Sequence, residues 1–321
     1  MKIITMIVLI ALGLGGESFF EKIRVYRGVT ALDVRLSSPE VANGHTLLFE
    51  CIPKVIDTVF DLTVARDTTA LRLYAHPTEP SGAFSVLIGI PYYAKLRSDT
   101  IHVEWTEMDR IYDRSLPFQI VRGPYKSEVI RGVPQSRVTP SAADYRRIAR
   151  ERRIIGEAYI AVRDSVLMDA TFSYPVEKQT ITSEYGTRRV FNGQLRSYHG
   201  GLDLRAYEGT PIYAAQSGTV KLSQNLFYSG NHVLIEHGMG IHSSYSHMSK
   251  LYVKHGDWVE KGRRLGLSGA TGRVTAAHLH WTVNINGVGV SPLQCFEVLN
   301  LLFKTPDAAL IKEKTRIIYE L

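Results

Sequence analysis

A group of histidines with one aspartate stands out between positions 199 and 280 of this 321-residue chain. His199 and Asp203 are four residues apart across a Gly-Gly pair, which lets the backbone bend tightly and aim both side chains at one point. His278 and His280 are two residues apart in a strand-like stretch, so both imidazoles would project from one face of a sheet. Two imidazoles, one carboxylate and an open position make a catalytic zinc site, in which the metal lowers the pKa of a bound water to about 7.

Each of these patterns has an ordinary structural explanation when it occurs alone. A single His-x-His on a strand is more often part of a half-exposed sheet face than a ligand pair, and a single His-x-x-x-Asp is a weaker signal still. The combination within one glycine-rich, β-patterned block is much more specific. The spacing does not decide which of His278 and His280 would bind the metal.

The whole block resembles the LytM/lysostaphin-type zinc metallopeptidases, which cut peptide cross-links of bacterial peptidoglycan. The resemblance covers roughly residues 171 to 297. The motifs that carry it are Ser183-Glu184-Tyr185-Gly186 with Arg188-Arg189, His199 to Asp203, Gly209-Thr210-Pro211, Ser217-Gly218-Thr219-Val220, Gly230-Asn231, Glu236-His237-Gly238, Tyr245-Ser246-His247, Gly256-Asp257-Trp258-Val259, Gly262, Gly269-Ala270-Thr271-Gly272 and His278-Leu279-His280-Trp281.

The resemblance implies a role for each residue of the group. His199, Asp203 and His280 are then the zinc ligands, whereas His247 and His278 flank the metal-bound water without binding the metal. In the family such a pair orients or deprotonates the water and stabilises the tetrahedral intermediate. Because ligation and base chemistry both need neutral imidazole, we expect activity to fall as the pH drops below about 6.5.

The chain departs from the family pattern at two places near the second histidine pair. Ala276-Ala277 stands where the family usually has Gly-Pro, and Thr282 stands where an acidic residue commonly follows. Neither position is a ligand, so we expect effects on loop shape or specificity and not on metal binding.

Three classes of function are compatible with the block. A zinc endopeptidase acting on peptidoglycan cross-links is the first, with a meso-diaminopimelate cross-link as the default substrate and a glycine bridge as an open alternative. A degenerate, non-catalytic wall-binding protein that activates a partner hydrolase is the second, but such members lack ligands and all five positions are present here. A lipoyl-like carrier is disfavoured because no attachment lysine stands at a hairpin tip.

Composition and charge limit the choice of partner. Apolar residues make up 45% of the chain and charged residues 21%, which is typical of a globular protein long enough for two domains. The net charge of +7 favours an anionic partner. No nucleic-acid-binding motif is present and the basic residues are dispersed, so the anionic bacterial envelope is the better match. A basic surface that merely faces solvent explains the charge equally well.

The first 16 residues have the pattern of a targeting segment. Lys2 is followed by an apolar run from Ile3 to Leu14, which is of signal-peptide length and short for a membrane span. No Ala-x-Ala cleavage site is present, so an uncleaved membrane anchor stays open, whereas no cysteine follows to carry a lipid. We therefore expect export to the periplasm or cell envelope of a bacterium.

The remaining chain is expected to be mainly β, with a helical connection between two domains. Residues 24–122 predict an immunoglobulin-like sandwich, 123–170 a linker with a helix that Ser141 caps, 171–302 an antiparallel, barrel-like peptidase domain, and 303–321 a helical tail. The sandwich carries no visible chemistry, so it would restrain the enzyme until a regulatory partner binds, or target it. Its expected strands are Thr46 to Ile52, Thr58 to Val64, Leu71 to Tyr74, Phe84 to Ile90, Thr100 to Trp105 and Phe118 to Val121.

Two cysteines are present, Cys51 and Cys295, one in each expected domain. In an exported protein they could form a disulfide that locks the domains together. The alternative is two buried free thiols.

Overall fold

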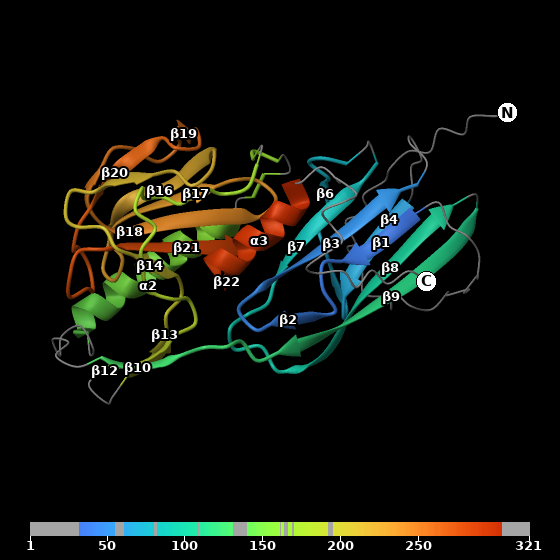
Figure 1. The fold of residues 1–321 in the computed structure, drawn as a ribbon, viewed down its shortest axis with the longest axis horizontal. Helices are drawn as coiled ribbons and strands as arrows, with labels where there is room; N and C mark the ends of the chain where they lie inside the picture. Colours follow the sequence, from blue (N-terminus) through green and yellow to red (C-terminus); the bar gives the residue numbers. More distant parts are fainter. Residues whose placement is uncertain are drawn as a thin grey trace.

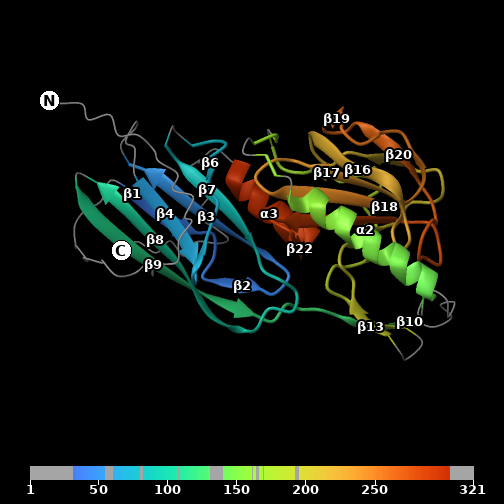
Figure 2. The ribbon, with the colours of Figure 1, turned by 180° about the vertical axis from the view of Figure 1, so that it is seen from behind.

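The computed structural model describes residues 32–54, 61–79, 82–107, 109–130, 140–160, 162–163, 166–168, 170–191 and 195–303. In these residues the chain is mainly β: two N-terminal sheets and a large C-terminal sheet lie at opposite ends of an elongated molecule (Figures 1 and 2). The expected targeting segment at 1–16 and the expected tail beyond Phe303 lie outside the described residues. Within the described part of the chain, no helix is long and apolar enough to cross a membrane.

The N-terminal region consists of a four-stranded and a five-stranded sheet. Their inward side chains form one apolar core to which both sheets contribute, including Phe49 from the first and Trp105 and Phe118 from the second. The first sheet has the order β1 (Leu32–Leu36), β3 (Thr46–Pro53), β7 (Phe84–Gly89) and β6 (Tyr74–Ala75); the second has the order β2 (Glu40–Ala42), β9 (Arg110–Val121), β8 (Arg97–Glu107), β4 (Asp61–Arg66) and β5 (Thr69–Ala70).

Five of the six expected strands overlap strands of these sheets, although residues 58–60 of the expected strand Thr58 to Val64 lie outside the described residues. The sixth differs. The stretch from Leu71 to Tyr74 was expected to be a strand, but only Tyr74 belongs to one, in the two-residue β6. Residues 71–73 follow the tight β4–β5 hairpin, and the backbone N–H of Leu71 returns to the carbonyl of Val64. The apolar side chains of Leu71 and Leu73 pack against the core, although these residues belong to no strand. Their apolar composition alone does not distinguish such a segment from a strand.

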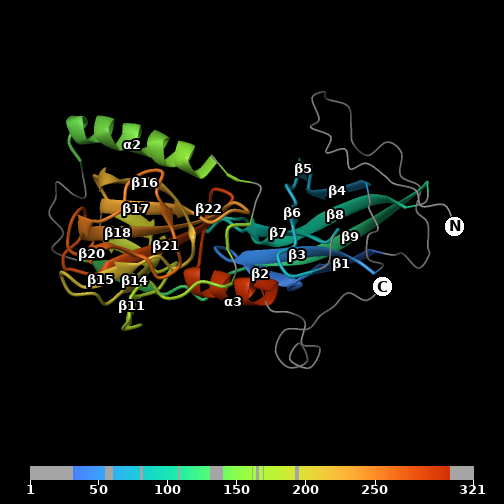
Figure 3. The ribbon, with the colours of Figure 1, turned by 90° about the horizontal axis from the view of Figure 1, so that it is seen from above.

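Helix α2 (Ala142–Ile160) confirms the helix predicted in the connection. Ser141 and Asp144 cap its first turn: the Asp144 backbone N–H donates to Ser141 Oγ at 3.2 Å, and that hydroxyl donates to Asp144 Oδ2 at 2.7 Å. Ile154 and Ile155 pack on Leu222 of the large sheet. Figure 3 shows α2 lying along one face of that sheet.

The C-terminal sheet is antiparallel, and a small three-stranded sheet stands beside it. Strand β10, which belongs to the connection, pairs in parallel with β12 of the small sheet. The large sheet follows the order β11 (Ile181–Ser183), β14 (Leu202–Leu204), β21 (Leu279–Ile285), β18 (Ile241–Leu251), β17 (Gly230–Glu236), β16 (Gly218–Leu226) and β19 (Trp258–Val259), with β15 (Pro211–Tyr213), β20 (Arg264–Ser268) and β22 (Val288–Val290) off this path; the small sheet has the order β10 (Ser127–Ile130), β12 (Arg188–Phe191) and β13 (Leu195–Tyr198).

Helix α3 (Pro292–Phe303) joins the two ends of the molecule. It lies between the N-terminal strands and the large sheet (Figure 3). Leu299 is fully buried in a core that also contains Leu48 and Leu87 of the N-terminal region. The Gln294 side chain forms two hydrogen bonds with the Thr46 backbone, at 2.7 and 2.9 Å. The core of the C-terminal sheet therefore extends to Leu48 and Leu87 of the N-terminal region, which also has a separate core between its own two sheets.

Both cysteines are free and buried. Cys51 belongs to the core of the N-terminal sheets, whereas Cys295 of α3 belongs to the core of the C-terminal sheet. Burial raises the pKa of each thiol to about 12. Of the two alternatives stated from the sequence, the structure therefore has two buried free thiols and no disulfide between them.

Candidate metal centre

The register of the large sheet brings the two ends of the histidine block together. Strands β14 and β21 are antiparallel neighbours, and Asp203 lies directly opposite His280. On the other side of β21, His280 lies opposite Ser246 of β18, the residue before His247. His199 follows strand β13 and reaches the same point from outside the sheet. Residues 81 positions apart in the sequence thus become direct neighbours.

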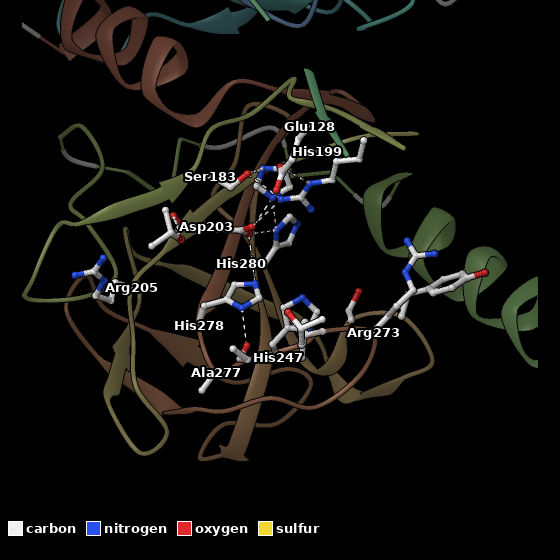
Figure 4. Close-up of a pocket in the computed structure, with 18 of the residues that line it drawn as sticks. Glu128, Ser183, His199, Asp203, Arg205, His247, Arg273, Ala277, His278 and His280 are labelled. Carbon is white, nitrogen blue, oxygen red and sulfur yellow. Dashed lines mark hydrogen bonds and ion pairs between the residues drawn. The ribbon is translucent and has the colours of Figure 1, made fainter. Parts of the chain in front are cut away.

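Three side-chain atoms converge at this point (Figure 4). The Nε2 atom of His199 lies 2.9 Å from Asp203 Oδ1 and 2.9 Å from His280 Nδ1, and the last two atoms are 2.7 Å apart. His199 and Asp203 are buried, and His280 is half-buried. Two imidazole nitrogens and one carboxylate oxygen aimed at one point are the donor set of a catalytic zinc site, so the residues present fit the predicted metal.

Neighbouring groups fix the orientation of two of these side chains. His199 Nδ1 lies 2.9 Å from the carbonyl oxygen of Glu184, which requires the proton on Nδ1 and leaves the Nε2 lone pair at the convergence point. The second carboxylate oxygen of Asp203 accepts from Arg189 at 3.1 Å. Arg189 also donates to Ser183 Oγ at 2.8 Å. Such outer contacts orient metal ligands and tune their basicity.

The second glycine of the Gly-Gly pair has a steric role. A Cβ atom on Gly201 would lie 2.6 Å from the Trp281 carbonyl oxygen and 2.8 Å from the His280 ring. The same atom on Gly200 would meet only the Tyr198 ring, at 4.0 Å. Gly201 therefore allows the turn after His199 to pass directly against the strand that carries His280.

His247 and His278 lie beside this cluster and resemble each other in their hydrogen bonds. His247 Nδ1 is 2.9 Å from the Thr271 carbonyl oxygen, and His278 Nδ1 is 2.9 Å from that of Ala276. The carbonyls accept from Nδ1 of each ring, which leaves Nε2 of His247 for the cavity, whereas Nε2 of His278 lies 3.5 Å from Asp203 Oδ1. The ring centroids are 5.0 Å apart. His247 has a φ of 64°, a left-handed conformation that is uncommon outside glycine and gathers at functional sites.

Burial and mutual contact shift the pKa values of the cluster. Burial alone would raise the pKa of Asp203, but hydrogen bonds with the histidines hold it well below its usual range. Burial lowers the pKa of His199, and burial together with the neighbouring imidazoles lowers that of His247 to about 3. For His278 burial acts in the same direction, but the hydrogen bond and charge of Asp203 outweigh it and raise the pKa.

Comparison with known proteins identifies a protein family for the region that carries this cluster. The model of peptidase family M23 matches residues 197–292, a span that contains all five side chains of the cluster. The C-terminal region of the chain belongs to peptidase family M23. We call residues 170–303 the M23 region from here on.

Individual relatives extend the match beyond the family model. Over 141 residues the chain is 40% identical to a peptidoglycan DD-endopeptidase, ShyA, of Vibrio cholerae, which covers 43% of this chain and 33% of that protein. Over 142 residues it is 31% identical to a DD-carboxypeptidase/endopeptidase, Mpg, of Neisseria meningitidis, covering 44% of this chain and 33% of the relative. The chain thus spans about a third of the length of these curated relatives.

A solved structure resembles more of the chain than the M23 region. The crystal structure of a putative M23 peptidase from Pseudomonas aeruginosa covers 74% of this chain and 88% of its own, with a TM-score of 0.55 and 25% identity. At 74%, the similarity extends beyond the M23 region into other parts of the chain.

The cluster opens into a cavity of about 590 Å³ in the M23 region (Figure 4). Its described lining residues begin at Glu128 of β10, so the described strands of the N-terminal sheets do not line it. The predicted site residues His199, Asp203, His247, His278 and His280 all do.

One further feature of the M23 region was not singled out from the sequence. Arg273 and Tyr228 form one part of the cavity wall, and the Cζ atom of the arginine lies 4.3 Å from the tyrosine ring centroid. No spacing signal could have joined residues 45 positions apart in different loops. His237 of the Glu236-His237-Gly238 motif is buried, with Nδ1 2.7 Å from the Ser217 carbonyl oxygen and Nε2 2.8 Å from Ser243 Oγ.

Proposed function

We propose that this chain is a zinc-dependent endopeptidase that hydrolyses peptide cross-links of bacterial peptidoglycan. The observation that carries the proposal is the convergence of His199, Asp203 and His280, with two more imidazoles on the same cavity wall, in a region of family M23. Relatives named as peptidoglycan DD-endopeptidases support the substrate class. Action in the cell envelope follows from that substrate, and the apolar segment at 1–16 would direct export.

His199, Asp203 and His280 would hold the zinc ion. When bound, the ion supplies Lewis acidity, which polarises a carbonyl group and acidifies water. The protein contributes the orientation of the donors: Glu184 accepts from His199 Nδ1, and Arg189 holds the second oxygen of Asp203. Because these two contacts are already formed, the side chains of His199 and Asp203 are oriented for metal binding in advance.

His247 and His278 are the proposed catalytic groups. Their Nδ1 protons are committed to backbone carbonyls, so Nε2 of His247 can take or return a proton at the cavity, whereas Nε2 of His278 lies 3.5 Å from Asp203 Oδ1. The lowered pKa of His247 keeps its ring neutral at ordinary pH, which is the form that accepts a proton from water. The ring centroid of His278 lies 5.0 Å from that of His247, and Asp203 raises the pKa of His278. In its protonated form His278 would stabilise charge that develops on the carbonyl oxygen.

Substitution of one ligand and one catalytic histidine tests this assignment. Purified protein is expected to carry about one zinc per chain, as in single-metal sites of this class, and exhaustive chelation to abolish peptidoglycan hydrolysis. His280→Ala should lose zinc and activity together. His247→Ala should keep zinc but lose roughly 10²-fold or more in rate, the usual range for general acid–base groups. Full activity after chelation, or loss of zinc from His247→Ala as readily as from His280→Ala, would contradict the assignment.

For the N-terminal region we propose an immunoglobulin-like sandwich. Two mainly antiparallel sheets share one apolar core, and Trp105 is fully buried between them. These are features of that fold class.

We further propose that this sandwich supports the metal centre. Tyr92 lies in the loop after β7, and its ring stacks on Tyr198, the residue before His199, at 3.9 Å with parallel planes. The Tyr92 hydroxyl donates to the Gly186 carbonyl at 3.0 Å. A restraining role would require sandwich residues over the cavity, and the described ones do not line it. Tyr92→Ala should therefore lower zinc affinity and rate, with the exposed Tyr145→Ala as control. A faster Tyr92→Ala enzyme would favour restraint.

A further inference from the structure

The outer face of helix α2 carries a concentration of arginines. Figure 3 shows α2 on the outside of the molecule, with the large sheet on its inner side. Its 19 residues extend over about 28 Å at 1.5 Å per residue. Within α2, all of which the structure describes, Glu157 is the single exposed acidic residue, whereas four arginines are exposed: Arg146, Arg150, Arg152 and Arg153. The outer face of the helix is therefore strongly basic.

Contacts within the protein do not neutralise these arginines. Arg146, Arg150 and Arg153 stand at positions i, i+4 and i+7, so they lie along one side of the helix. Among the described residues, no carboxylate forms an ion pair with Arg146, Arg150 or Arg152. Arg153 lies 3.8 Å from Glu157, and both side chains are largely exposed, which makes this pair weak. The row of positive charge is available to a partner.

A fifth arginine shows how the inner side of α2 differs. Arg147 donates to Glu151 at 2.6 Å and to Asn225 of the large sheet at 3.0 Å. Glu151 also accepts from the backbone N–H of Phe227, and the next residue, Tyr228, lines the cavity of the metal centre. The inner side of α2 therefore holds the helix against the sheet and beside the cavity wall, and the outer arginines are not needed for this attachment.

Two large side chains with apolar surface accompany the arginines. Tyr145 is 54% exposed and Ile160 is 80% exposed. Ile160 follows Arg153 by seven residues and Tyr145 precedes Arg152 by seven, so each stands two turns from an arginine on the same side of the helix. A soluble anionic polymer offers such side chains no apolar phase. A bilayer offers phosphates to the arginines and the boundary of its acyl chains to the tyrosine and the isoleucine.

We propose that the outer face of α2 binds the surface of a membrane that contains anionic lipid. The apolar run from Ile3 to Leu14, expected to direct export, would bring the chain to a membrane, and the arginines supply a second attachment. Docking of α2 keeps the cavity close to the membrane, because the inner side of the helix contacts the turn that carries Tyr228. This inference goes beyond the proposed peptidase activity and does not depend on it.

Co-sedimentation of the full chain with two kinds of vesicle tests the proposal. One kind contains phosphatidylcholine alone, and the other contains phosphatidylcholine and phosphatidylglycerol in equal amounts. The apolar run at 3–14 meets both, so the ratio of the two affinities reports the effect of lipid charge. The combined change Arg146→Gln, Arg150→Gln and Arg153→Gln should lower the affinity for anionic vesicles on the order of 100-fold, roughly fivefold for each arginine, and leave neutral vesicles unaffected. The same three changes to lysine should keep most of the affinity.

An equal change of charge in another part of the chain is the control. Lys95→Gln, Arg110→Gln and Arg122→Gln remove three exposed charges from the N-terminal region and the start of the connection, and together should lower the affinity far less. Thermal unfolding should be unaltered in all these variants, since glutamine and lysine are as compatible with a helix as arginine. Equal binding of the wild-type chain to both kinds of vesicle, or an equal loss in the two glutamine variants, overturns the proposal.

The two apolar positions separate a membrane from a soluble polyanion. Tyr145→Ser with Ile160→Ser should weaken binding to anionic vesicles and leave binding to polyphosphate unchanged. If this variant bound the vesicles as well as the wild-type chain, while the arginine variant lost polyphosphate and vesicles alike, the face would bind anionic polymers and the membrane would be the wrong partner.

Discussion

The two halves of this molecule bury different kinds of side chain. The core of the N-terminal sheets is apolar, and its buried charge is confined to small groups such as Glu50, which accepts from Arg35 at 2.9 Å and contacts His76 at 3.0 Å. The described M23 region instead buries five histidines: His199, His232, His237, His242 and His247. The first interior only has to exclude water, whereas the second also has to hold polar groups in fixed positions.

Buried imidazoles need partners, and these partners determine the geometry of the site. His237 and Tyr245 both bond to Ser243 Oγ, and the Tyr245 hydroxyl accepts from the Ala215 backbone N–H at 2.8 Å. His232 Nδ1 lies 3.0 Å from Ser246 Oγ, on the residue opposite His280. A network of this kind makes the M23 sheet specific in position but sensitive to change. His242 is the exception among the described histidines just named, because neither of its ring nitrogens has a hydrogen-bond partner.

The largest expected loss of stability tests whether the N-terminal region and the M23 region are coupled through α3. Leu299→Ala removes a fully buried side chain from the core that both regions share, so it should lower the free energy of unfolding by about 2–5 kcal/mol. Leu301, on the same helix, is 47% exposed, and its replacement by alanine should change stability by less than about 0.5 kcal/mol. Urea unfolding followed by two region-specific probes measures both. If Leu299→Ala destabilised one region alone, the shared core would not couple them.

The next effect concerns the metal centre and uses two adjacent glycines. Gly201→Ala should displace the strand carrying His280, because the new Cβ would lie 2.6 Å from a backbone oxygen. We expect zinc affinity to fall roughly 10- to 100-fold, as when supporting groups of metal sites are lost. Gly200→Ala has room and should bind zinc normally. Competition with a chelator gives both affinities, and equal values would remove the steric role of Gly201.

Acid should destabilise the M23 region through its buried histidines. Burial lowers the pKa of His237 to about 3, against about 6.5 in an unfolded chain. The unfolded state therefore binds a proton first as the pH falls, and the stability contributed by neutral His237 is complete above pH 6.5 and is lost progressively down to pH 3. Between pH 6.5 and 5 the loss is about 2 kcal/mol.

The slope of unfolding free energy against pH measures this contribution. His237→Gln should flatten the slope between pH 6.5 and 5, whatever its effect on stability at pH 7. The exposed His255→Gln should leave the slope unchanged. An unaltered slope in His237→Gln would mean that His237 does not contribute to acid sensitivity.

The same difference between the halves explains what could be predicted from the sequence. Alternating apolar residues predicted most of the N-terminal strands. The helical spacing of apolar residues predicted α2, and Ser141 was correctly predicted as its cap. Helix α3 was not predicted, although Gln294, Glu297 and Asn300 recur at helical spacing in its otherwise apolar run from Pro292 to Phe303.

Motif spacing identified the histidines but not the contacts that orient them. The pairing of Asp203 with His280 depends on strand register, and the ion pair of Arg189 with Asp203 depends on the neighbouring small sheet. The stacking of Arg273 on Tyr228 joins two loops that only the folded sheet brings together. These contacts are non-local, and a one-dimensional pattern does not contain them.

The smallest expected loss of stability concerns Glu151 in helix α2, which lies in the connection between the two regions. Glu151 of α2 is 8% exposed; it accepts from the Phe227 backbone N–H at 2.8 Å and from Arg147 at 2.6 Å. Glu151→Gln keeps the shape but weakens both bonds, so we expect a loss of about 1 kcal/mol.

Glu157 of the same helix provides the matched control, since its side chain is 68% exposed and lies 3.8 Å from Arg153. Glu157→Gln should cost less than about 0.5 kcal/mol. Thermal unfolding of both variants at two salt concentrations makes the comparison. Because Phe227 precedes Tyr228, Glu151→Gln should also increase hydrogen exchange at the β16–β17 turn, and Glu157→Gln should not. Equal exchange in the two variants would show that α2 covers the sheet without fixing the turn that supports Arg273.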